Sequence, residues 1–148
     1  MKLNDFIICD DIRTEVNNKV SLIGVYNDAL NFIVPERAAA LWPKAIRLGI
    51  FIRVDLESIE EFQKIGKFIL KSTINGEPNF NAEQVFTEKI QENHPLRRMT
   101  ISVAFNQVNI NNAGDMVLSL SIFDNNGELM EKFSYPGNIK ITEIIQKI

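Results

Sequence analysis

Residues 6–26 read FIICDDIRTEVNNKVSLIGVY, and this stretch decides the fold class. Two apolar runs flank the dipeptide Asn17-Asn18, which is typical of a tight turn between two antiparallel strands. The adjacent acids Asp10 and Asp11 interrupt the first run. The stretch therefore predicts a β-hairpin that carries an acidic pair inside its first strand.

Alternation of apolar and polar residues recurs along the chain. Between Ile46 and Val54 aliphatic residues occupy every second position, which predicts a strand with one face in a core. Turn dipeptides follow other alternating runs, at Asn75-Gly76 and Asn126-Gly127. Further strands are expected at 67–74, 100–106, 116–123 and 129–135, with weaker runs at 31–34 and 85–90. Eight or nine short strands predict an all-β protein, a sandwich or a barrel.

Two short segments carry helical signals. Ser58 to Glu61 matches a capping box, yet we expect residues 59–67 to form a loop that leads into a strand. Near the C-terminus Thr142 is a suitable cap, and helical spacing there predicts a short helix with an apolar stripe. The stripe consists of Ile141, Ile144, Ile145 and Ile148. We expect this helix to pack on its own sandwich, with docking on a neighbouring molecule as the alternative.

Length, composition and charge limit the class of protein. The 148 residues, 45% hydrophobic and 24% charged, are typical of one globular domain spanning residues 1–148. A net charge of -3 gives no reason to expect nucleic-acid binding. Cys9 is the only cysteine, so no internal disulfide can form, and a cytoplasmic location is expected. Neither an export signal nor an apolar run of the roughly 20 residues that span a membrane is expected.

The residue types that common catalytic sites require are scarce. His94 and Cys9 are the only histidine and cysteine, which excludes a zinc site built from such ligands. Neither a phosphate-binding loop nor a nucleophile elbow occurs. We expect His94 to be an exposed loop residue, and we predict no catalytic residue, no metal site and no cofactor. Aspartates near strand ends or turns are interpreted as turn formers, with a calcium site as the alternative: Asp10, Asp11, Asp28, Asp55, Asp115 and Asp124.

The acidic pair is the sharpest candidate site. Strict alternation directs either Asp10 or Asp11 toward apolar neighbours unless a bulge intervenes. A buried carboxylate needs a cationic partner, which Arg13, Arg47 or Arg53 can supply. We select these five residues as the candidate binding site and interpret them as a structural ion pair or a bulge. An enzyme that uses Asp10 or Asp11 in acid–base catalysis is the less favoured alternative.

The first hairpin, CDDIRTEVNNKVSLIGVY at residues 9–26, also carries a resemblance. It resembles a group of small bacterial and phage-associated domains of unknown function, in which a Cys-Asp stretch with Arg and Glu, a short turn with Lys, and an S-L-I-G-x-Y stretch recur. The segments AIRLGIFIRV (45–54) and GDMVLSLSIFDNNGEL (114–129) are similar to later strands of that group. The resemblance implies an antiparallel β-sandwich of immunoglobulin-like or C2-like type and supplies no catalytic residue.

These observations together predict a non-catalytic binding or scaffolding module. We expect a protein partner, contacted through loops or a sheet edge, because a rigid sandwich is a frequent platform for recognition. A calcium- or lipid-binding module of C2 type is the first alternative. The sequence leaves homo-oligomerisation open.

Overall fold

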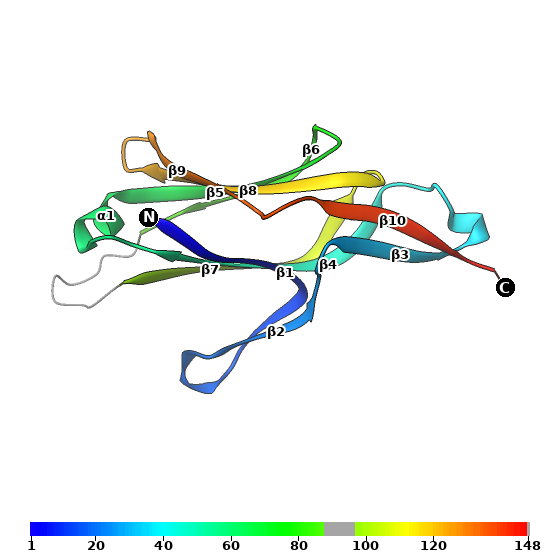
Figure 1. The fold of residues 1–148 in the computed structure, drawn as a ribbon, viewed down its shortest axis with the longest axis horizontal. Coiled ribbons are helices and arrows are strands. Elements are labelled where there is room, and N and C mark those ends of the chain that lie inside the picture. The colour runs from blue at the N-terminus through cyan, green and yellow to red at the C-terminus, as the bar shows by residue number, and fades with distance from the viewer. Residues whose placement is uncertain (88–96, 148) are drawn as a thin grey trace.

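Strands make up most of the computed structural model, which describes residues 1–87 and 97–147. Besides the strands it has one α-helix, α1 (Ile59–Lys64), and two 3₁₀ turns, Val16–Asn18 and Glu36–Ala38. The ten strands are β1 (Lys2–Thr14), β2 (Val20–Val25), β3 (Ala29–Pro35), β4 (Lys44–Asp55), β5 (Ile65–Ile74), β6 (Glu77–Val85), β7 (Arg98–Ile110), β8 (Gly114–Asp124), β9 (Leu129–Ser134) and β10 (Ile139–Gln146). They stack as two layers (Figure 1). The predicted all-β sandwich is confirmed, with ten strands instead of eight or nine.

Each layer is one sheet. The first has the order β2-β1-β4-β7 and is antiparallel throughout. The second has the order β3-β10-β8-β5-β6, and β9 pairs with β8 on the edge that β10 also uses. Among the described strands β3 and β10 alone pair in parallel, which departs from the expected antiparallel pairing. The weak strand predicted at 31–34 is part of β3, whereas residues 88–90 of the run at 85–90 lie outside the described residues.

The core consists of the inward-facing residues that the alternation predicted. On β4 the side chains of Leu48, Ile50, Ile52 and Val54 have no exposed surface, and the same holds for Met116, Leu118, Leu120 and Ile122 on β8. Buried residues from both sheets form one contiguous cluster. Because burial of each such side chain contributes roughly 1.5–3 kcal/mol, this cluster is the main source of stability.

The predicted C-terminal helix is wrong, because the segment forms β10. Ile139 and Ile141 are almost fully buried at alternate positions, and residues 140–146 pair with residues 29–35 of β3. Two physical reasons favour the strand. A helix of two turns is marginal by itself, and β-branched residues such as isoleucine fit a pleated sheet better than a helix. Ile148, the last member of the predicted stripe, lies outside the described residues.

The expected loop after Ser58 is also wrong, since residues 59–64 form α1. The capping signal decides the local structure here. The Oγ atom of Ser58 accepts a hydrogen bond from the backbone N–H of Glu61 at 3.2 Å, and the Glu61 carboxylate accepts one from the N–H of Glu57 at 2.8 Å. Phe62 anchors this short helix in the core, where only 3% of its surface is exposed.

Candidate functional site

The candidate residues lie where β1 changes partners. Residues 2–9 of β1 pair with β4, and residues 9–14 pair with β2. From Cys9 onward β1 and β2 form a two-stranded arm, residues 10–25, that leaves the two layers on the outer side of the β4–β7 sheet (Figure 1). Gly49 permits this departure, because a Cβ atom there would lie 2.7 Å from Cγ1 of Ile12 and 2.9 Å from Sγ of Cys9.

Asp11 is held by two arginines at the base of the arm. One carboxylate oxygen lies 2.8 Å from the guanidinium of Arg47, and the other accepts a hydrogen bond from Nε of Arg13 at 3.3 Å. The Asp11 side chain is only 13% exposed, so its charge needs these partners. The predicted structural ion pair is confirmed for these three residues.

Asp10 points to the other face of the arm and has a different partner. Its carboxylate accepts a hydrogen bond from the hydroxyl of Tyr26, and it lies directly over Gly24, where a side chain would collide with it. Burial and the neighbouring Asp10 carboxylate raise the pKa of the Tyr26 hydroxyl. The β1–β2 register is unbroken from Cys9 to Thr14, so of the two interpretations, an ion pair or a bulge, the bulge does not occur at the acidic pair. The strand accommodates the two acids by leaving β4 instead.

Arg53 is not part of this cluster. Its guanidinium donates a hydrogen bond to the carboxylate of Asp5, which lies at the register shift of β1 that follows Leu3. The same guanidinium lies 5.7 Å from the ring centre of Phe51. The structure therefore joins Asp11, Arg13 and Arg47, and places Asp10 and Arg53 in contacts of their own. Each of the five side chains takes part in a contact that involves a residue of β1.

Two aspartates of the calcium alternative, Asp55 and Asp124, are engaged by the protein itself. Arg98 donates two hydrogen bonds to Asp55, at 2.7 and 3.3 Å, and lowers the pKa of that carboxyl to about 2. The carboxylate of Asp124 closes the β8–β9 turn by accepting two backbone N–H groups at 2.8 Å. Within residues 1–87 and 97–147, no three His, Cys, Asp or Glu side chains gather as a metal site would require. His94 lies outside the described residues.

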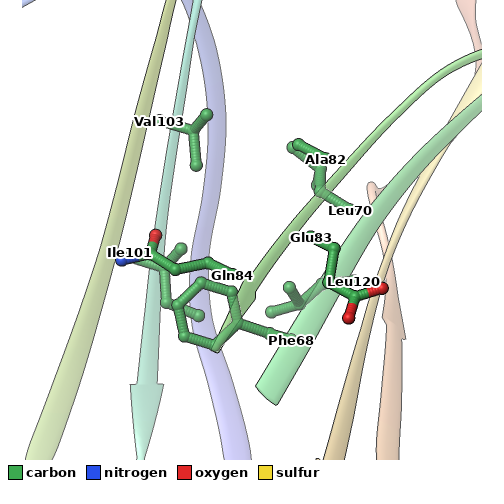
Figure 2. A pocket seen from close by; sticks show the side chains of 8 residues that line it. All are labelled: Phe68, Leu70, Ala82, Glu83, Gln84, Ile101, Val103 and Leu120. Atoms are coloured by element: carbon green, nitrogen blue, oxygen red, sulfur yellow. The ribbon is translucent and has the colours of Figure 1, made fainter. Parts of the chain in front are cut away.

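A feature that the sequence did not reveal is an apolar cleft between β6 and β7, the outermost strands of the two sheets (Figure 2). Its volume is about 240 Å³. Glu83 and Gln84 lie at its rim, and Figure 2 shows Gln84 extending from β6 toward Ile101 on β7. The apolar lining consists of Phe68, Leu70, Ala82, Ile101, Val103 and Leu120. A second hollow of about 320 Å³ shares Phe68, Gln84 and Ile101 and extends the cleft along the same strands.

The cleft follows from the residues that β6 turns inward. Phe80 packs on Phe105 of β7 with ring centres 5.3 Å apart, and Phe86, just beyond β6, packs on Phe62 of α1 at 5.0 Å. Between these two large rings the inward positions belong to Ala82, whose single methyl group cannot reach β7, and to Gln84, which extends toward Ile101. A small and a polar residue between two aromatic ones are the sequence signal that could have indicated the cleft.

One end of the cleft is tied by hydrogen bonds. Asn79 lies at a register shift of β6, from which its amide donates to the carbonyl of Asn109 at 3.2 Å and accepts from the N–H of Asn111 at 2.9 Å. Asn109 is the second-last residue of β7 and Asn111 follows the strand directly. The sheets are therefore held together beside Phe80 and separate toward Ala82.

A second feature missed from the sequence is an ion pair under the loop between β3 and β4. The Nζ atom of Lys44 lies 2.6 Å from the Glu143 carboxylate, which also accepts the N–H of Ala40 at 2.8 Å. These contacts lower the pKa of Glu143. Glu143 escaped notice because its neighbours Ile144 and Ile145 were assigned to a helix.

Neither a protein-family model nor a curated protein matches this sequence. The resemblance of the first hairpin to small bacterial and phage-associated domains therefore stays a prediction. In the described part of the chain, no helix has the length and apolar character that crossing a membrane would require.

Proposed function

We propose that the protein is a non-catalytic binding module that receives an extended segment of a partner protein along the β6–β7 cleft. One observation carries the proposal: an apolar cleft of about 240 Å³ separates two outermost strands. Neither strand has a second strand partner among the described residues. An extended peptide can add to such an edge through main-chain hydrogen bonds while alternate side chains enter pockets.

The size and lining of the cleft support an aliphatic or aromatic side chain as the occupant. A dry cavity of about 150 Å³ lined by Leu, Ile and Phe is large enough for benzene, so this cleft has room for a side chain of that size. Its floor is formed by Leu70, Leu120 and Phe68, which are buried core residues. The floor is thus rigid, and binding would not require the core to repack.

The polar groups at the cleft favour binding over catalysis. Glu83 and Gln84 are the polar side chains at its rim, and Figure 2 shows the Glu83 carboxylate directed away from Ile101 and Val103. General acid–base catalysis requires a titratable group within hydrogen-bond reach of the reacting atoms. The cleft instead offers an apolar floor for a side chain and the free edges of β6 and β7 for the backbone of a peptide.

The test is a selection of displayed random peptides of about ten residues, the length of a long strand. Peptides that alternate apolar and polar residues should be enriched on the wild-type chain. Ala82→Phe fills the cleft and should weaken the binding of the enriched peptides at least roughly tenfold. A tenfold loss of affinity corresponds to about 1.4 kcal/mol of binding free energy. Asn81→Phe is the matched control, because Asn81 is the adjacent, exposed residue of the same strand and faces away from the cleft.

Gln84→Trp covers the rim from an exposed position and provides a second blocking variant, should Ala82→Phe lower stability. Thermal unfolding of each variant shows whether the fold is intact. The proposal fails if no peptide is enriched, or if enriched peptides bind both blocked variants as well as they bind the wild type.

A further inference from the structure

We propose that β2 is a self-association edge, through which two copies of the chain pair β2 against β2 in antiparallel orientation. The proposal is independent of the β6–β7 cleft, which lies at the opposite edge of the fold. In the first sheet β2 is the outermost strand at one side and β7 at the other.

The composition of β2 sets it apart from the other outermost strands. Its sequence, VSLIGV, contains neither a charged residue nor a proline. Within the described residues each of the others contains such a residue: Pro35 in β3, Glu77 and Pro78 in β6, Arg98 in β7, and Glu131 and Lys132 in β9. Charges and prolines on an edge prevent pairing with another chain, and an apolar edge without them invites it.

The exposure of the arm adds a second argument. Val20, Ile23 and Val25 are each more than a third exposed, and Val16 at the tip is 80% exposed. Beyond Cys9 the arm consists of two strands only, and a two-stranded ribbon is marginally stable in water. Pairing of two arms produces four strands in the order β1-β2-β2-β1, which is enough for a stable sheet.

The charges near the two ends of β2 favour the antiparallel orientation. Lys19 precedes the strand, with Glu15 opposite it at the tip of the arm, whereas Asp28 follows the strand and the carboxylate of Asp10 lies over Gly24 near its end. Antiparallel pairing of two copies brings each Lys19 toward the acidic end of the other copy. Parallel pairing would place Lys19 beside its own counterpart. Because a two-fold axis makes this contact self-complementary and closed, it yields a dimer and not an open chain of molecules.

The mass of the full chain in solution, measured by light scattering across a wide range of protein concentration, tests the proposal. We expect the wild type to reach twice its monomer mass of 16.9 kDa. Ile23→Lys should be monomeric. Val117→Lys is the matched control and should remain dimeric, because Val117 is 38% exposed, close to the 39% of Ile23, but belongs to the interior strand β8.

Two further variants test the geometry. Lys19→Glu should raise the dissociation constant of the dimer roughly tenfold, with a smaller effect at high salt. Ile23→Cys should give a disulfide-linked dimer on oxidation, whereas the wild type should not, because its only cysteine, Cys9, is fully buried. The proposal is overturned by a wild type that stays monomeric, by a dimer that survives Ile23→Lys, or by equal loss of the dimer in Val117→Lys.

Discussion

Adding one methyl group at Gly49 should destabilise the protein through the arm. Replacement of glycine by alanine in a compatible strand normally raises stability by about 0.4–1 kcal/mol. At this position the new Cβ would lie 2.7 Å from Cγ1 and 3.2 Å from Cδ1 of Ile12, and 2.9 Å from Sγ of Cys9. Overpacking of this kind costs about 1–3 kcal/mol, so Gly49→Ala should have a net destabilising effect.

Urea unfolding monitored by circular dichroism measures the effect. With a denaturant dependence of roughly 2 kcal/mol per molar, overpacking lowers the midpoint by about 0.5–1.5 M and the glycine-to-alanine gain offsets about 0.2–0.5 M of this, which leaves a net fall of up to about 1.3 M. The same substitution made in an Ile12→Ala background should cost less, because two of the three close atoms belong to Ile12. The coupling energy between the two sites should be about 0.5–3 kcal/mol. A Gly49→Ala protein as stable as the wild type, or an equal cost in both backgrounds, would refute this account of the arm.

Three other outcomes are expected. The thiol of Cys9 is fully buried and burial raises its pKa, so alkylation should occur only as the chain unfolds; rapid labelling in native buffer would contradict this. The hydroxyl of Ser72 is buried and has no hydrogen-bond partner among the described residues, so Ser72→Ala should keep or raise stability, by up to about 1 kcal/mol in urea unfolding, and a marked loss would be evidence for a hidden partner. Lys44 holds the pKa of Glu143 below its usual value of 4.5, so the charged pair stabilises the fold above that pH and this contribution is lost as the pH falls through the lowered pKa. The melting temperatures of wild type and Glu143→Gln should therefore differ at neutral pH and converge in acid, whereas a constant difference would show that the carboxylate charge is irrelevant.

The sandwich could be predicted from the sequence because its strands obey a two-residue period. The alternation from Ile46 to Val54 places Leu48, Ile50, Ile52 and Val54 correctly in the core, although Gly49 and Phe51 on the other face of β4 are also buried. That an arginine would pair with one acid of the Asp10-Asp11 pair was also predictable, since a carboxylate within an apolar strand requires a cation, but which acid and which arginines pair was not. What periodicity cannot specify is the point at which a strand changes partners, as β1 does at Cys9, because that depends on the close approach allowed by Gly49.

The errors came from segments in which two local signals competed. In the last residues the isoleucines satisfy helical spacing and alternate spacing at once, and the choice is made by β3, a strand more than a hundred residues away in sequence. After Ser58 the local signal decided the structure and no distant strand overrode it, since the cap was sufficient to form α1. The cleft escaped prediction because it results from the distance between two sheets, whereas Ala82 alone is an ordinary strand residue.

The parallel pairing of β3 with β10 has a consequence for how the chain folds. Asn31 and Thr142, which are hydrogen-bonded neighbours in this ladder, are 111 residues apart in sequence. Among the described residues β3 pairs with β10 alone, so during synthesis it has no strand partner until residues 139–146 have been made. Contacts of such long range slow folding, because the intervening chain must be ordered first. We therefore expect that the last strand completes the fold and that, until then, the apolar side chains of Leu30 and Val34 are open to other nascent chains.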